Sequence, residues 1–315
     1  MAHESLDVSR RGKQRTVRSI SLGPNMLILI RGKLLRIGEI HDELWIPRKN
    51  IQALPLILEQ LICRPDRPDI LTYAQKLQTQ APIYPYYYEC DNLAVVQIET
   101  HKEWFDNQIA RMVRKQIRKA AREGIRVEVV PFTDDFVDGI CSIYNETPIR
   151  QGRKFWHYGK DRETVKKENG SYLDRSIFIG AFNEGELVGF TKIVFDEEVA
   201  MFMQILSKLA YFRKGTNDAL VSKAIEVCEH RQAKYLIYGQ YAYGKKERSS
   251  LIEFKKSLGF NKVEIPRYFV PLTLRGRAAL ILRLHRGFRA HVPSFINKGF
   301  IWLRGRFYRL RRKSL

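Results

Sequence analysis

The sequence SIFIGAFNEGELVGFTKIVFDEEVAMFMQILS, residues 176–207, has the pattern of three consecutive β-strands. Apolar and β-branched residues dominate Ser176–Phe182, Leu187–Phe195 and Ala200–Ser207, and strands favour these residue types. Asn183–Gly185 supplies a tight turn that closes a hairpin between the first two runs. We therefore expect a mostly antiparallel sheet in this part of the chain.

Further elements follow these strands. The residue patterns predict a helix over Asn217–Arg231, a strand over Tyr235–Tyr238, a helix over Leu251–Ser257 and a last strand over Phe269–Leu272. Ser249 or Ser250 can cap the second helix, and Gly259 can end it. The combination indicates a mixed α/β fold.

The chain before residue 176 is less regular. We expect a polar, mobile arm at residues 1–22 and a basic helix that Gly124 ends, in which Lys and Arg recur at helical spacing over Ile109–Arg122. The other predictions are strands over Met26–Ile30, Leu34–Ile40, Glu43–Ile46, Ala94–Glu99 and Arg126–Val130, and helices over Ile51–Cys63, Ile70–Gln78, Asp134–Tyr144 and Arg162–Asn169.

The composition limits the classes of protein that fit. Lys and Arg number 55 against 34 Asp and Glu, which gives a net charge of +21, and 44% of the residues are apolar. Such a composition excludes disorder over the whole chain. The cysteines lie far apart and the histidines do not cluster, so neither a disulfide framework nor a metal site is indicated. The chain lacks the apolar core of a signal peptide and any run of the ~18 apolar residues that spanning requires, which predicts a cytoplasmic protein.

More than half of the net charge lies in residues 274–315, which contain twelve Lys or Arg and no Asp or Glu. Bulky apolar residues such as Leu280, Leu284 and Trp302 alternate with the cations. This pattern favours one or two amphipathic helices, with a break near Pro293, on the anionic inner face of a membrane. A docked extension with a solvated basic face is the alternative, and an RNA phosphate backbone is a third possibility.

The order of the elements and three short motifs resemble known enzymes. Three antiparallel strands, a helix, a strand, a short helix ending in FKKSLGF (Phe254–Phe260) and a last strand resemble the N-acetyltransferases of the GNAT superfamily. RKAAREGI (Arg118–Ile125) and IYNETPIRQG (Ile143–Gly152) are similar to segments of the Fem-type, or FemAB-like, peptidoglycan aminoacyltransferases, which are two GNAT-like domains in tandem.

This resemblance covers roughly Tyr86–Leu272 and implies an α/β (α+β) fold. The expected architecture is a GNAT-like, mostly antiparallel sheet flanked by helices, preceded by a truncated GNAT-like half and followed by a basic helical tail. The expected divisions are a mobile arm at 1–22, a partial GNAT-like region at 23–131, a GNAT-like acyltransferase domain at 132–273 and the tail at 274–315.

The resemblance also implies a donor site. The enzymes that use CoA bind its pyrophosphate at a glycine-rich loop that opens the central helix. The matching stretch here, Tyr211–Ala219, has one glycine, preceded by two cations. Aminoacyl-tRNA-using relatives often lack an intact loop, so tRNA is the alternative to acyl-CoA. The residues expected to bind acyl-CoA are Gln204, Arg213, Lys214, Gly215, Thr216 and Asn217.

Acyl transfer to an amine requires that the oxyanion be stabilised and the amine deprotonated. Lys255 of FKKSLGF matches a lysine that the Fem-type resemblance places near the reacting carbonyl, although an exposed helix lysine such as Lys256 is the simpler interpretation. A tyrosine after the preceding strand can act as general acid. Tyr238, Tyr241 and Tyr243 compete for this role, and we select Tyr241.

Acceptor-binding candidates lie in the segment RQGRKFW. Arg150 and Arg153 flank Gly152, and an arginine fork matches a phosphate group. In the resembling family, the arginine of this segment is linked with the phosphate of the acceptor. Trp156 is a candidate platform for a sugar or lipid, with core packing as the alternative. The acceptor expected is an amine on an envelope or polysaccharide precursor, carried by a phosphorylated sugar or a lipid.

Three hypotheses about function stay open. The first is an N-acyltransferase that uses acyl-CoA and is held at the membrane by its tail. The second is a Fem-type aminoacyltransferase that uses charged tRNA, for which the net charge of +21 is suitable. The third is a catalytically inactive GNAT-like binding module.

Overall fold

The computed structural model describes residues 5–10, 13–23, 26–77, 80–150, 152–243 and 249–286. In these residues twelve strands form one sheet, in the order β1-β2-β3-β4-β5-β14-β6-β13-β12-β11-β10-β7. Neighbouring strands are antiparallel except in two pairs, β4–β5 and β12–β13. The mixed, mostly antiparallel sheet flanked by helices that the sequence predicted is confirmed.

The elements have the following bounds. The strands are β1 (Ser5–Arg10), β2 (Lys13–Ser21), β3 (Leu27–Arg31), β4 (Ile37–Ile40), β5 (Ile70–Ala74), β6 (Tyr88–Gln97), β7 (Arg126–Val130), β8 (Ile149–Arg150), β9 (Arg153–Lys154), β10 (Ser176–Asn183), β11 (Glu186–Asp196), β12 (Val199–Ser207), β13 (Tyr235–Gln240) and β14 (Asn261–Pro271). The helices are α1 (Leu54–Ile62), α2 (His101–Glu103), α3 (Arg111–Arg122), α4 (Asp134–Asn145), α5 (Arg162–Asn169), α6 (Leu209–Phe212), α7 (Thr216–His230), α8 (Ser250–Ser257) and α9 (Leu274–Ile281). Short turns of other helix types are η1 (Arg48–Asn50), η2 (Trp104–Gln108), η3 (Leu173–Arg175) and η4 (Leu284–Arg286).

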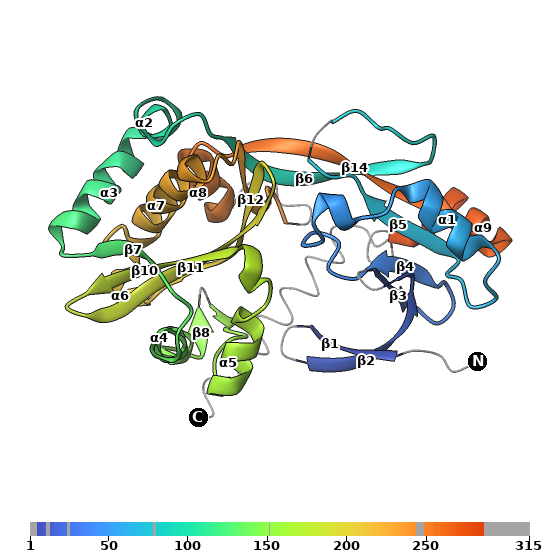
Figure 1. Ribbon diagram of the computed structural model, residues 1–315, viewed down its shortest axis with the longest axis horizontal. Helices are drawn as coiled ribbons and strands as arrows, with labels where there is room; N and C mark the ends of the chain where they lie inside the picture. The colour runs from blue at the N-terminus through green and yellow to red at the C-terminus, as the bar shows by residue number, and fades with distance from the viewer. Residues whose placement is uncertain are drawn as a thin grey trace.

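Two strands from distant parts of the chain form the centre of the sheet. β6 and β14 pair antiparallel from Tyr88–Tyr268 to Val95–Asn261 and lie along the top of the view in Figure 1. Beyond β14, the parallel pair β5–β4 is followed by β3 and β2. Beyond β6, the parallel pair β13–β12 is followed by β11 and β10. Each parallel pair is joined by a crossover helix, α1 or α7, so the sheet contains the same arrangement twice around β6–β14.

Helices cover both faces of the second half. α7 and α3 pack on one face, where Leu220, Ile225 and Leu236 are completely buried. α4 packs on the other face, where Ile140 and Phe190 are completely buried. In the first half, α1 buries Leu54, Ile57 and Leu61 against β3, β5 and β14. Both α1 and α9 lie at the far end of the molecule from α3 (Figure 1).

The sequence predictions hold better in the second half than in the first. Between residues 126 and 272 the predicted helices and strands are present, with one large difference: β14 begins at Asn261 rather than at Phe269. The polar arm expected at residues 1–22 instead contains β1 and β2, because backbone groups of Arg18–Ser21 pair with β3.

Two other predictions in the first half are wrong. Ile70–Ala74 is strand β5 rather than the start of a helix, because β4 and β14 flank it and its first four residues are buried. A strand covered on both faces has a continuous apolar run, which periodicity cannot distinguish from a buried helix. Glu43–Ile46 forms turns rather than a strand, since Asp42 adopts a left-handed backbone with φ of 52°.

The predicted basic tail is described only at its start, where α9 and η4 lie. Pro293 and Trp302, on which the tail prediction depended, are outside the described residues. Among the helices that the structure describes, none is long and apolar enough to cross a membrane.

The Tyr268 hydroxyl on β14 is a buried junction, and its loss should destabilise the protein. It donates to Gln75 Oε1 at 2.8 Å and accepts from the backbone N–H of Ile83 at 2.7 Å. Tyr268→Phe should lower the free energy of unfolding by roughly 1–3 kcal/mol, because the buried Gln75 side chain loses a hydrogen bond. Urea denaturation measures this, with the exposed Tyr158→Phe as control. Equal stability of the two variants would contradict the assignment.

Candidate active site

The parallel strands β12 and β13 separate part of the way along their length. They pair from Val199–Tyr235 to Met201–Ile237, and β12 then continues alone on this side as far as Ser207. Both strands also have an irregular register here: β12 beside β11 between Phe202 and Gln204, and β13 beside β6 between Ile237 and Gln240. The facing edges therefore have backbone groups that are free of the ladder and that a ligand can use.

Lys255, on α8, is buried behind β13 at this opening. Its side chain is 1% exposed, and its Nζ donates a hydrogen bond to the carbonyl oxygen of Gln240. The ring centres of Tyr238 and Tyr243 lie 4.9 and 5.1 Å from Nζ. No carboxylate forms an ion pair with Lys255 in the described part of the chain. Burial therefore lowers the pKa of this ammonium to about 8.

The local sequence turns Lys255 inward. The Ser249 hydroxyl caps α8 by accepting a hydrogen bond from Ile252 N at 3.2 Å. Ile252 and Lys255, three residues apart, then lie on the same buried face of the helix, whereas Lys256 is exposed. Gly259 ends the motif with φ of 84°, a conformation that favours glycine. The sequence motif thus distinguishes one lysine of the pair from the other.

Asp218 belongs to the same group of side chains, and the sequence analysis missed it. It lies in the first turn of α7, where burial raises the pKa of its carboxyl to about 6. Burial, Tyr243 and Asp218, in that order, raise the pKa of the Tyr238 hydroxyl, whose ring lies beside Lys255. An acidic residue in the first turn of a helix is usually explained by the helix dipole. The sequence therefore did not indicate a functional role for Asp218.

The predicted donor-binding residues other than Gln204 lie where α7 meets α3. Gly215 caps α7 with φ of 81°, and a Cβ built there would lie 2.3 Å from the carbonyl oxygen of Gln116 on α3. Thr216 is completely buried, and Asn217 Oδ1 is a buried acceptor with no partner among the described residues. Arg213 is exposed and Lys214 pairs with Glu123 at 3.8 Å. This segment is therefore partly covered by α3.

Gln204 and the predicted acceptor residues form a separate group on the α4 face. Gln204 Oε1 accepts from the Tyr144 hydroxyl at 2.8 Å, and its Nε2 lies 3.3 Å from Nε2 of the buried His157. Arg150 donates to the carbonyl oxygens of Ser207 and Ile143 and pairs with Glu146, so most of its donors are already used. The remaining two candidates, Arg153 and Trp156, are exposed nearby on and after β9.

Tyr241 is the tyrosine that the sequence favoured as general acid. None of the contacts of Lys255 described above involves it. Its backbone N–H donates to Asn92 O at 3.2 Å, and its ring packs against the core that α7 covers. The tyrosines beside Lys255 are Tyr238 and Tyr243, a choice that the sequence alone could not make. A catalytic role for Tyr241 stays a prediction.

Two cavities lie where the two halves of the sheet face each other. The larger has a volume of about 720 Å³, and its lining includes Gly239 and Gln240, the residue whose carbonyl accepts from Lys255. Its floor is apolar, with Val199, Met201 and Ile237. Its wall carries the ion pairs of Arg267 with Glu43 at 2.9 Å and Asp91 at 2.7 Å.

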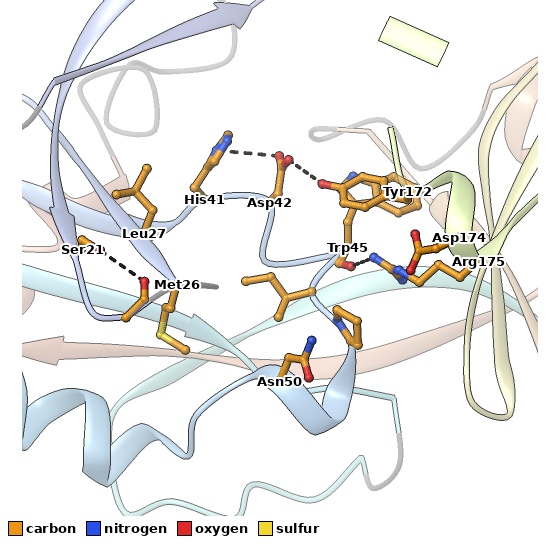
Figure 2. A pocket seen from close by; sticks show the side chains of 13 residues that line it. Ser21, Met26, Leu27, His41, Asp42, Trp45, Asn50, Tyr172, Asp174 and Arg175 are labelled. Carbon is orange, nitrogen blue, oxygen red and sulfur yellow. Dashed lines mark hydrogen bonds and ion pairs between the residues drawn. The ribbon is translucent and has the colours of Figure 1, made fainter. Parts of the chain in front are cut away.

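The smaller cavity, of about 510 Å³, shares a wall of Asp42, Trp45 and Arg175 with the larger one, because these residues line both. Figure 2 shows the residues that line the smaller cavity. The Tyr172 hydroxyl donates to Asp42 Oδ2 at 2.6 Å and joins the two halves. Both residues have left-handed backbones, with φ of 53° and 52°. Such strain in non-glycine residues persists only where the surrounding structure holds it, so this wall is a firmly built part of the molecule.

Comparisons with solved structures identify the fold. The chain is similar to FemX (10% identity, TM-score 0.56, covering 89% of this chain and 90% of that chain). It is also similar to the C-terminal domain assigned to a lysylphosphatidylglycerol synthetase from Agrobacterium fabrum (13%, 0.54, 85% and 88%) and to L-PGS from Bacillus licheniformis (15%, 0.53, 86% and 88%). The fold is therefore of the kind found in FemX and these synthetase domains, as the Fem-type resemblance implied. No family model and no curated protein matches the sequence.

Asp218 should cost the folded protein stability at neutral pH. Its pKa is raised from 3.8 to about 6, so the folded state binds more protons than the unfolded state between these values, and stability falls as the pH rises through them. Asp218→Asn should raise the free energy of unfolding by roughly 1–3 kcal/mol at pH 7.5, with the gain disappearing near pH 4. The matched control is Asp135→Asn, an exposed first-turn aspartate on α4. A gain independent of pH would exclude this cause.

Proposed function

We propose that this protein is a Fem-type acyltransferase that transfers an acyl group to an amine, with the reaction at the opening between β12 and β13. The observation that carries the proposal is Lys255, a buried cation without a carboxylate partner among the described residues, placed at a gap in the sheet. Burial of an unpaired charge destabilises the folded protein, and ionisable groups perturbed in this way cluster at functional sites. The similarity to FemX and L-PGS supports the same class of reaction.

The reaction assigns a role to each group around Lys255. The amine nitrogen attacks the donor carbonyl carbon, a C–N bond forms and the ester or thioester bond to the carrier breaks. The Lys255 ammonium stabilises the oxyanion of the tetrahedral intermediate. Asp218, with a pKa of about 6, is ionised at neutral pH and accepts the proton that the amine loses, and Tyr238 or Tyr243 supplies a proton to the leaving group.

Aminoacyl-tRNA is the donor that we favour. The segment at Gly215, where CoA pyrophosphate would bind, is packed against Gln116. α3 itself presents four exposed cations on one face, for which the structure gives no ion pair in its described part: Arg111, Lys115, Arg118 and Arg122. Unpaired cations in a row suit the phosphates of an RNA helix, and the Fem-type resemblance implies a tRNA donor.

Acyl-CoA is the second candidate donor. α7 begins at Gly215 without a side-chain cap, and Arg213 is exposed beside it. An uncapped helix start with an adjacent cation is suited to a phosphate group. An inactive binding module is the outcome if neither donor binds.

The larger cavity is the proposed acceptor site. Its apolar floor fits an alkyl or peptide segment, and its charged wall provides hydrogen-bonding groups for polar ends. Gln240, whose carbonyl accepts from Lys255, lines this cavity, which supports an approach of the amine to Lys255 through the opening between β12 and β13. We propose the amine of an envelope or polysaccharide precursor as the acceptor.

Lys255→Met should lower kcat for acyl transfer by about 10²–10³-fold, the usual effect of removing one oxyanion donor. KM for the donor should change little, because the interaction forms in the transition state. Lys255→Arg keeps the positive charge and tests whether its exact position matters. The matched control is Lys256→Met, which changes the exposed neighbouring lysine. Full activity of Lys255→Met with an unchanged melting temperature would rule out the catalytic role.

Binding assays separate the donors. Bulk aminoacyl-tRNA should bind with strong salt dependence, and Lys115→Gln/Arg118→Gln/Arg122→Gln should reduce the slope of log K against log salt by about 2–3. The control Lys49→Gln/Lys154→Gln/Lys167→Gln removes three exposed lysines away from α3. Calorimetric binding of acetyl-CoA without tRNA binding would favour the second donor, and binding of neither would favour the inactive module.

A further inference from the structure

The surface formed by α9 and η4, residues 274–286, presents large apolar side chains to solvent. Leu274 is 82% exposed, Ile281 81% and Leu282 62%. Leu34, 87% exposed, lies beside them, because Arg275 donates to its carbonyl oxygen at 3.3 Å. Single exposed apolar residues are ordinary on a protein surface, whereas several on one short element indicate an interaction site. We call these residues the α9 surface.

The rest of the protein holds α9 in a fixed orientation. Gly276 packs so closely that a Cβ there would lie 2.0 Å from the carbonyl oxygen of Asp69. The Thr273 hydroxyl accepts from Gly276 N at 3.0 Å and donates to Asp69 Oδ1 at 2.8 Å, which caps the helix and ties it to the loop before β5. Ala279 is buried on the same face. The apolar side chains therefore point outward because the opposite face is docked.

The charge of the α9 surface has one sign. Arg275, Arg277, Arg283 and Arg286 are exposed, and residues 265–286 contain no Asp or Glu. Glu89 pairs with Arg286 at 2.7 Å, while no ion pair is found for the other three arginines within the described ranges. Protruding aliphatic side chains between unpaired arginines match the two layers of an anionic bilayer, whose headgroups attract the cations and whose acyl region accepts the apolar groups. An RNA backbone would interact favourably with the arginines but not with the aliphatic side chains.

We propose that the α9 surface docks the protein on an anionic lipid bilayer. The position of this surface relates membrane docking to the larger cavity. The buried His285, in η4, is among the residues that line the larger cavity, so docking brings this side of the cavity towards the membrane. This last step rests on the proposed function: an amine acceptor carried by a lipid would then reach the cavity from the bilayer. The docking itself needs only the apolar and basic residues of the surface.

Vesicle sedimentation of the full chain tests the proposal. Vesicles of phosphatidylcholine with about 30% phosphatidylglycerol should bind the protein at low salt, and pure phosphatidylcholine vesicles should bind it weakly. Leu274→Ser/Ile281→Ser/Leu282→Ser keeps every charge and should weaken binding at least tenfold. Arg275→Gln/Arg277→Gln/Arg283→Gln should weaken it by about fivefold for each cation that lies close to the headgroups, the equivalent of about 1 kcal/mol each.

The matched control removes the same charge elsewhere. Arg111→Gln/Lys115→Gln/Arg118→Gln, on α3, should keep vesicle binding within about twofold. The proposal is overturned if the protein ignores anionic vesicles, if both α9 variants bind as the unmodified chain does, or if the α3 variant loses as much. A variant defective in a soluble protein complex but not in vesicle binding would assign the surface to a protein partner. Acyl transfer to a soluble acceptor should survive in the α9 variants, so failure of docking and failure of the transferase proposal give different results.

Discussion

The pairing of β6 with β14 is the constraint on which the rest of the structure depends. It joins strands that lie more than 160 residues apart in the sequence and turns two similar strand arrangements into one sheet. It also fixes β6 beside β13, whose register with β6 is interrupted between Ile237 and Gln240. That interruption occurs at the carbonyl to which Lys255 donates, and the same strand lines the larger cavity. The seam between the halves thus sets the geometry of the candidate site.

The site concentrates ionisable groups that are poorly compensated. Lys255 is buried without an ion pair in the described part of the chain. Burial raises the pKa of Asp218, and a hydrogen bond to its own backbone opposes this rise only in part. The cavity wall differs, because Arg267 pairs with both Glu43 and Asp91. A buried network with its partners in place holds structure, whereas unpaired groups with displaced pKa values are available for proton transfer and charge stabilisation. This contrast is why the catalytic proposal centres on α8 and the start of α7.

Local patterns predicted the second half well and the first half poorly. The run over residues 176–207 is rich in strand-forming residues and contains a tight turn at Asn183–Gly185, features that depend on near neighbours, so its three strands follow from sequence. β5 could not be recognised, because its antiparallel partner in the sheet, β14, comes from the other end of the chain. In the site, FKKSLGF indicated Lys255, and the structure shows that it, unlike Lys256, is buried. Asp218 carried no sequence signal, because its displaced pKa depends on burial that only the assembled fold provides.

The central claim is that Lys255 is an uncompensated buried cation at the sheet opening. Carbon-13 NMR of the intact protein with labelled lysine side chains measures this directly, and Lys255→Arg assigns the resonance. The account predicts that Lys255 titrates at a pH of about 8, well below the ordinary lysine value of 10.5. A midpoint at the ordinary value, shared with the exposed lysines, would contradict the account, because it would mean that Lys255 is solvated or paired.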